Sequence, residues 1–191
     1  NINLPRFFDP IIPNTFTIDK AGTWRIWISD KSGQTASGTI QAYSINSELS
    51  DGITSIAAME DATQLSDFAL YGTPITYFAT IDHHFENLHL YANTTEITLG
   101  NTYEITSDIQ LTAKCSPKSF TIRFVTGVET EASEPISEPS QTKIYRELLD
   151  EPPARYRKGK IIEGWYLDLS DESTRWDFTT CIVDTDKILY A

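Results

Sequence analysis

The stretch "GWYLDLSDESTRWDF", residues 164–178, decides how the C-terminal part of the chain is interpreted. It contains two of the four tryptophans, Trp165 and Trp176, with Tyr166 and Phe178 beside them. An acidic, hydroxyl-rich run separates the two aromatic groups. Clustered aromatic rings beside carboxylates fit a sugar-binding platform, and they equally fit the core of a small β domain with one solvated loop. The sequence on either side has to decide between these alternatives.

Length and charge limit the classes of protein that the chain can be. Its 191 residues accommodate one large domain or two small ones. The net charge of −12 at pH 7 argues against a nucleic-acid partner and against an anionic membrane surface, because both attract Lys and Arg. No apolar run approaches the roughly 18 residues of a membrane span, so no span is expected in this segment.

The start of the chain and its cysteines carry little information. The sequence begins at Asn1 without an initiator methionine or a signal-like apolar stretch, so we expect a trimmed or processed product whose location no leader reveals. Two cysteines, Cys115 and Cys181, are too few for a disulfide scaffold, and their spacing fits no zinc motif. We expect free thiols, with a bridge as the alternative.

Alternation of β-branched or aromatic residues with polar ones predicts a mainly β protein. Residues 15–30, "TFTIDKAGTWRIWISD", predict two strands around Ala21-Gly22, and residues 37–46, "SGTIQAYSIN", predict another. Only "MEDATQLSDF" (59–68) and "KIYRELLDE" (143–151) predict short helical turns. The alternation places Trp24, Ile26 and Ile28 on one face of the strand. Trp27 lies on the other face.

The middle of the chain shows internal similarity at steps of 20 to 22 residues. Ile-Thr pairs fall at 53–54, 75–76 and 97–98, and an apolar-x-apolar series lies between them. The members of that series are Phe68-x-Leu70, Leu88-x-Leu90 and Ile109-x-Leu111. The clearest copy, "FENLHLYAN" (85–93), fits the pattern L-x-x-L-x-L-x-x-N and ends at Asn93.

Over about residues 40–116 this pattern resembles the bacterial leucine-rich repeat family. The resemblance implies a short solenoid in which the apolar pairs point inward from short stacked strands. The Asn side chain then satisfies backbone groups where the chain turns away from the strand. The third copy departs from the pattern, since Lys114 stands in the Asn place. An irregular β-sandwich with evenly spaced strands is the alternative.

From Ser119 onward several hallmarks follow one another in order. A predicted strand at 121–125 precedes an acidic stretch, "VETEASEPISEPSQ" (128–141). The later hallmarks are Pro152-Pro153, Gly159, the triplet G-W-Y at 164–166, the triplet W-D-F at 176–178 and L-Y-A at 189–191. Over about residues 119–191 this order resembles the Listeria–Bacteroides repeat, also called the internalin B-repeat, of bacterial surface proteins. Three departures are Val128 for a second Gly, Lys160 for an aromatic residue and Cys181 where Pro is common.

The second resemblance implies a small β-grasp-like sheet packed on a short helical or turn segment, "YRELLDE" (145–151). It makes the acidic stretch the loop of the first hairpin and divides the chain into domains 1–117 and 118–191. It also favours the core interpretation of the opening stretch, because burying each large ring contributes roughly 2–3 kcal/mol. "LDLSDEST" (167–174) is then a solvated hairpin loop.

The sequence shows no catalytic signature. There is no G-x-S-x-G elbow, no Gly-rich phosphate loop and no Cys–His pairing. Asp82, His83, His84 and His89 are candidate metal ligands, but adjacent histidines point in different directions. We interpret the pair as exposed loop residues and place His89 on a strand. We therefore expect no enzyme, no metal and no cofactor.

A binding surface is easier to argue than a catalytic site. In a leucine-rich repeat, the residues beside the apolar pairs face outward: here Ala69, Tyr71, His89, Tyr91, Gln110 and Thr112. Tyr71 and Tyr91 are expected side by side, roughly 5 Å apart at the backbone, with His89 beside them. Tyrosine is enriched at binding hot spots. The alternative is that both tyrosines merely fill strand positions.

Together the two resemblances imply a non-catalytic, secreted or cell-surface bacterial protein. Its expected role is adhesion or macromolecule binding through the repeat domain, with a protein or glycan partner on a host or neighbouring cell. The first alternative is a structural spacer or stalk within a larger surface protein. The second is a carbohydrate-binding module.

Overall fold

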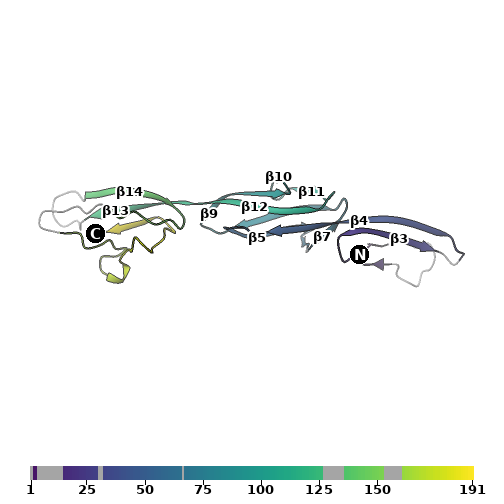
Figure 1. Cartoon of the computed structure of the whole chain (residues 1–191), viewed down its shortest axis with the longest axis horizontal. Helices are drawn as coiled ribbons and strands as arrows, with labels where there is room; N and C mark the ends of the chain where they lie inside the picture. Colours follow the sequence, from purple (N-terminus) through teal and green to yellow (C-terminus); the bar gives the residue numbers. More distant parts are fainter. Residues whose placement is uncertain (1, 4–14, 30–31, 66, 127–135, 153–160) are drawn as a thin grey trace. The chain divides into compact units, whose positions relative to one another are not determined.

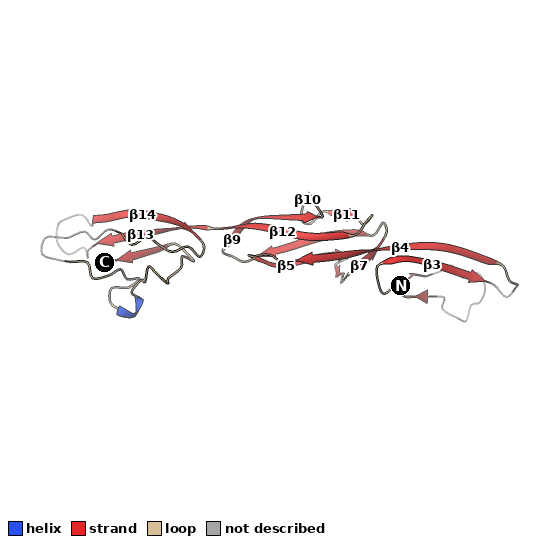
Figure 2. Ribbon diagram, viewed as in Figure 1, coloured by secondary structure: helices blue, strands red, loops and turns tan. Residues whose placement is uncertain are grey.

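The computed structural model describes residues 2–3, 15–29, 32–65, 67–126, 136–152 and 161–191 (Figure 1). The chain is mainly β, as predicted, and the one helical element of the described part is the 3-10 turn η1, Glu172–Thr174 (Figure 2). That part contains no helix long and apolar enough to cross a membrane. The chain divides into two compact units, residues 1–82 with 87–115, and residues 83–86 with 116–191.

The strands before residue 118 range in length from two residues to 14. They are β1 (Ile2–Asn3), β2 (Thr15–Phe16), β3 (Gly22–Ser29), β4 (Thr35–Glu48), β5 (Ile53–Glu60), β6 (Thr63–Gln64), β7 (Phe68–Leu70), β8 (Pro74–Ile81), β9 (Phe85–Ala92), β10 (Thr95–Ile97), β11 (Thr102–Glu104) and β12 (Ile109–Pro117). The second unit adds β13 (Ser119–Thr126), β14 (Ile136–Ile144) and β15 (Lys187–Tyr190).

The first unit contains two larger sheets that share one core. One sheet has the order β10-β9-β12-β4-β3, with β7 paired to β4, and the other has the order β11-β8-β5-β6. Buried side chains from both sheets form a single cluster: Ile45, Ile53, Ala58, Ala69, Ile75, Tyr77, Leu90, Ile105, Leu111 and Ala113. Two sheets around one apolar core form a β-sandwich.

This architecture replaces the predicted leucine-rich-repeat solenoid. A solenoid requires the strands at 68–70, 85–92 and 109–117 to stack on one another, but β7 pairs antiparallel with β4 instead. In the other sheet, β5 and β8 also pair antiparallel. The solenoid prediction is therefore wrong, and the sandwich alternative describes the unit.

Short turns explain why an even spacing misled the prediction. The pairs Glu60↔Thr63 and Ala92↔Thr95 leave two-residue turns at Asp61-Ala62 and Asn93-Thr94. Such turns join antiparallel strands, whereas parallel strands require a long crossover. β5 and β9 are each eight residues long and are each followed by such a turn and a short partner strand, so evenly spaced apolar residues arise here without a solenoid coil.

One local part of the solenoid prediction is confirmed. The Asn93 amide donates to the Asp108 carbonyl at 3.2 Å, and its side-chain oxygen accepts from the Gln110 backbone N–H at 2.9 Å. Asn93 has a φ of 55°, a left-handed conformation that Asn tolerates better than most residues. The side chain therefore satisfies backbone groups at a turn, as the pattern implied.

The alternation predicted for residues 24–28 is confirmed, in a strand that forms a hairpin with β4. The two strands pair antiparallel from Gly22↔Ala42 to Ser29↔Thr35. The burial of β3 alternates along its whole length. Trp24, Ile26 and Ile28 lie on the partly buried face, while Trp27 lies on the other face and is 72% exposed.

The second unit is a three-stranded sheet with the order β14-β13-β15. β13 pairs antiparallel with β14 and parallel with β15, so the first and last strands of the unit are neighbours. The first predicted strand and the first hairpin are therefore confirmed. Part of the acidic stretch predicted as a loop, residues 136–141, belongs to β14, while residues 127–135 lie outside the described part.

The core of this unit is built from the predicted aromatic residues. Trp165 is 2% exposed and Trp176 is 7% exposed, which confirms that both are buried. The Trp165 ring meets the Phe124 ring edge to face, with centroids 5.0 Å apart. The other buried members of the cluster are Ile122, Leu149, Val183 and Leu189. The loop between the tryptophans is solvated, as predicted, since nearly all of residues 167–175 are exposed.

The two predicted helical turns are wrong. Residues 59–64 form the end of β5, a tight turn and β6. Residues 145–150 form a turn in which Arg146 has a φ of 72°, which no α-helix allows. Arg146 N–H donates to the Val183 carbonyl, and Val183 N–H donates to the Glu147 carbonyl. Hydrogen bonds to a segment distant in sequence therefore replace helical ones. Pro153 and Gly159 lie outside the described residues.

Candidate binding surface

A polar and aromatic cluster covers part of the six-stranded sheet of the first unit. His89 and Tyr91 lie on β9, two residues apart, and the intervening Leu90 is buried in the core at 1% exposed. Because side chains alternate along a strand, His89 and Tyr91 project from the opposite face of the sheet. This confirms that His89 lies on a strand.

Two further residues complete this cluster. Glu96 on β10 lies opposite Tyr91, and its carboxylate lies 2.6 Å from Nδ1 of His89. The Lys114 ammonium on β12 lies 5.3 Å from the centre of the Tyr91 ring, within cation–π range. We call His89, Tyr91, Glu96 and Lys114 the β9 cluster. Three strands thus present an imidazole, a carboxylate, a phenol and an ammonium group together.

Glu96 and Lys114 were not predicted as site residues. The two-residue turn at Asn93-Thr94 sets the register that brings Glu96 opposite Tyr91. That register was available from the sequence once the turn had been identified. In the sequence Lys114 only departs from the repeat pattern, whereas in the structure β12 brings it against Tyr91.

Tyr71 is separate from the β9 cluster. It follows β7, is 63% exposed, and its ring lies 6.4 Å from the ring of Tyr43. Its backbone N–H donates to the Gln41 carbonyl at 2.8 Å. The strand order does not make β7 and β9 neighbours, because β7 pairs with β4 whereas β9 lies between β10 and β12. The expectation that Tyr71 and Tyr91 sit on adjacent strands is therefore wrong.

The predicted register also fails within β7 itself. Ala69 is buried at 4% exposed, although the repeat pattern placed it on the outward face. Phe68 and Leu70 are only partly buried. Tyr71 escapes burial because the strand ends at Leu70 and the chain turns at Tyr71-Gly72.

The histidine pair lies in the turn between β8 and β9. His83 is exposed, as predicted, but His84 is partly buried and stacks on Tyr145 with ring centroids 4.2 Å apart. His83 and His84 belong to the second unit whereas Asp82 belongs to the first, so neither unit by itself contains all three candidate ligands.

The two cysteines are free thiols, as predicted. Burial and the neighbouring Asp51 carboxylate raise the pKa of the Cys115 thiol, and its sulfur lies 3.4 Å from the Asp51 carbonyl oxygen. A raised pKa keeps a thiol protonated and lowers its reactivity. Cys115 therefore lacks the features of a nucleophile.

In the second unit, the three aromatic triplets are connected through their backbones. Trp176 N–H donates to the Trp165 carbonyl at 2.7 Å, which links W-D-F to G-W-Y. Tyr166 and Tyr190 exchange two bonds of 2.8 Å, which link G-W-Y to L-Y-A. The hallmarks therefore build one core.

Residues 120–191 match the family model of the Listeria-Bacteroides repeat domain. The match confirms the resemblance that the ordered hallmarks carried. The family is found in bacterial surface proteins and is a surface-protein domain type, not a known enzyme family. No solved structure matches the chain.

Within residues 120–191, the carboxylates of Asp168 and Asp177 stabilise two exposed turns by accepting hydrogen bonds. Hydrogen bonds from the Ser170 hydroxyl and backbone N–H lower the pKa of Asp168, and those from Thr179 and Thr180 lower the pKa of Asp177. Both side chains are therefore ionised at neutral pH and act as acceptors within their own turns. Neither carboxylate has the raised pKa that a general acid needs.

Proposed function

We propose that the protein is a non-catalytic cell-surface or secreted bacterial protein that binds a protein or glycan on a host or neighbouring cell. The match of residues 120–191 to a domain type of bacterial surface proteins carries this proposal. The Listeria–Bacteroides repeat domain serves as a structural unit, because its large aromatic residues form its own core. The binding role belongs to the sandwich.

The β9 cluster is the first contact region that we propose. Tyr91 offers a large contact area at low entropic cost, and His89 adds a polar group on the same face of β9. The His89–Glu96 pair is about half exposed on both sides, so a partner can reach each group. The cluster provides donors, acceptors and an aromatic face, which suit either a protein or a glycan.

Tyr71 is a second proposed contact. Its 63% exposure leaves most of the ring free to meet a partner, and Tyr43 supports it from β4. Tyr71 is not adjacent to the β9 cluster in the sheet order, so its contribution to binding is expected to be separable from that of the cluster.

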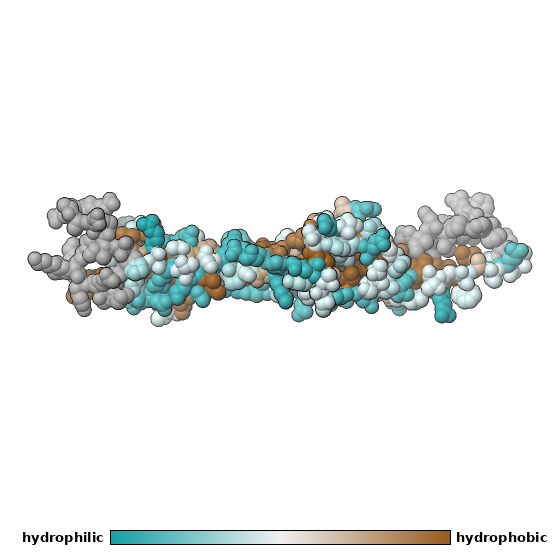
Figure 3. Space-filling view, turned by 90° about the horizontal axis from the view of Figure 1, so that it is seen from above, coloured by the Kyte–Doolittle hydropathy of each residue, from teal (hydrophilic) through white to brown (hydrophobic). Residues whose placement is uncertain are grey.

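Figure 3 shows hydrophilic side chains over much of the visible face, with smaller hydrophobic groups between them.

We expect that replacing His89 and Tyr91 together by alanine weakens binding to the target cells about 30-fold or more, because two hot-spot truncations that cost about 1–2 kcal/mol each remove at least about 2 kcal/mol of binding free energy. Fluorescently labelled full chain is titrated onto cells of the host or neighbouring species, and bound protein is measured by flow cytometry. Trp27→Ala is the matched control, since Trp27 is an exposed strand aromatic outside the cluster.

Unchanged binding by a folded double variant would remove the β9 cluster from the proposal. If Tyr71→Ala alone then abolished binding, the contact would lie at Tyr71 instead. Absence of any saturable binding of the unmodified protein would favour the spacer role.

A further inference from the structure

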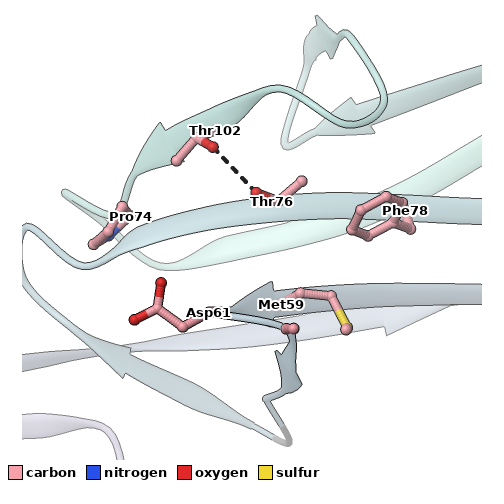
Figure 4. Close-up of a pocket in the computed structure, with 7 residues that line it drawn as sticks. Met59, Asp61, Pro74, Thr76, Phe78 and Thr102 are labelled. Carbon is pink, nitrogen blue, oxygen red and sulfur yellow. Dashed lines mark hydrogen bonds between the residues drawn. The ribbon is translucent and has the colours of Figure 1, made fainter.

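A hollow of about 350 Å³ lies on the outer face of the four-stranded sheet of the first unit (Figure 4). β8 alternates in burial there, with Ile75 and Tyr77 in the core and Pro74, Thr76 and Phe78 on the outer side. Seven residues line the hollow: Met59, Asp61, Ala62, Pro74, Thr76, Phe78 and Thr102.

The strand register places these residues together. Thr76 lies opposite Met59 on β5 and opposite Thr102 on β11, so the three form a row across the sheet. The Thr76 and Thr102 hydroxyls are 3.1 Å apart. Phe78, which is 44% exposed, comes two residues further along β8. The floor therefore combines a thioether, an aromatic ring and two hydroxyl groups.

The turn between β5 and β6 brings a carboxylate to the hollow. Asp61 and Ala62 have φ values of 44° and 64°, the left-handed pair of a two-residue hairpin turn. From this turn the Asp61 side chain points toward β8 (Figure 4). An anionic group thus lies at one end of a mostly apolar floor.

The charge around the hollow has a single sign. The segment from Ser32 to Ala113 contains ten Asp and Glu residues and no Lys or Arg. β5, β6, β8 and β11 therefore contain no Lys or Arg that could neutralise Asp61 from the same sheet. A cationic ligand complements this surface, whereas an anionic one is repelled.

We propose that this hollow receives the basic side chain, lysine or arginine, of a partner protein. The aliphatic stem packs on Met59 and Phe78, because long basic side chains bury their methylene groups and keep the charged head outside. The cationic head meets the Asp61 carboxylate, at the other end of the hollow from Phe78 (Figure 4). The site is on the other sheet from the β9 cluster and does not depend on it.

The test is a titration of the ¹⁵N-labelled full chain with Nα-acetyl-lysine methylamide, followed by NMR shifts of assigned backbone amides. We expect saturable shifts at residues 59–64, 74–78 and 102, with a dissociation constant on the order of millimolar. The norleucine analogue has the same stem length without the ammonium group, and we expect it to bind about three- to fivefold more weakly.

Asp61→Asn isolates the charge without disturbing the turn, because Asn adopts left-handed φ values readily. We expect this variant to bind the lysine compound about three- to fivefold more weakly. Glu48→Gln, on β4 of the other sheet, removes the same charge elsewhere and should bind like the unmodified chain.

Four results would overturn the proposal. The first is shifts that never localise to the lining residues, and the second is equal binding of the norleucine analogue. The third is an Asp61→Asn variant that binds lysine as the unmodified chain does. Methyl glucoside is titrated in parallel, and localised binding of the sugar in place of lysine would also overturn the proposal and assign the hollow to a glycan.

Discussion

Replacing Trp165 by alanine is expected to destabilise the Listeria–Bacteroides repeat domain by about 3–5 kcal/mol. Trp165 is 2% exposed and packs edge to face on Phe124, so its removal leaves a large cavity in the centre of the core. A domain of this size is stable by only about 5–10 kcal/mol, so the loss removes a large share of its stability.

The measurement is urea unfolding followed by NMR peaks of residues 120–191, which separates this domain from the sandwich. Leu169→Ala, in the exposed loop between the two tryptophans, should shift the midpoint very little because Leu169 is 46% exposed. If Trp165→Ala melted like the unmodified chain, the aromatic core interpretation would be wrong, and the sugar-platform alternative would return.

Replacing Ile75 by alanine is expected to destabilise the sandwich by about 2–5 kcal/mol. Ile75 is fully buried on β8, where the side chains of both sheets meet. On the same strand Phe78 points outward, so Phe78→Ala should cost less than about 1 kcal/mol although it removes more atoms.

These two substitutions test the side-chain register of β8, because a shift of one residue exchanges the two faces of a strand. Urea unfolding followed by NMR peaks of residues 35–115 reports on the sandwich alone. A larger loss of stability in Phe78→Ala than in Ile75→Ala would contradict the two-sheet arrangement.

The C-terminal unit was largely predictable because its signals are specific residues in a fixed order. Trp165 and Trp176 supply the large apolar area that a small domain needs for its core, and the order of the hallmarks favoured that interpretation over a sugar platform. The helical segment at 145–151 was wrong because bonds to Val183, distant in sequence, hold Arg146 and Glu147 in a turn. Helix propensity depends on the local sequence alone and does not predict hydrogen bonds to residues distant in sequence.

The sandwich was less predictable because hydrophobic spacing does not specify which strands pair. Leu90 and Leu111 lie in the core, as predicted. The prediction buried Leu70 and exposed Ala69, whereas Ala69 is buried and Leu70 is only partly buried. The same inward positions suit a solenoid coil and a sandwich strand, and only the short turns at Asp61-Ala62 and Asn93-Thr94 exclude the coil.

The candidate site was only partly predictable for the same reason. His89 and Tyr91 share a strand, so their relation follows from alternation alone. Their contacts with Glu96 and Lys114 depend on neighbouring strands, as does the separation of Tyr71. The hollow beside Asp61 does not follow from the sequence, because "MEDATQLSDF" predicts a helical turn, which would place Met59 and Asp61 on different faces.

We propose that the protein acts at the bacterial surface, and antibody labelling of intact cells tests this location. Antibodies against the purified chain are applied to native bacteria before and after lysis, with a cytoplasmic protein as the control for leakage. The account predicts that intact and lysed cells bind the antibody to a similar extent, or that the protein is recovered from the medium. Labelling that appears only after lysis, together with the cytoplasmic control, would contradict it.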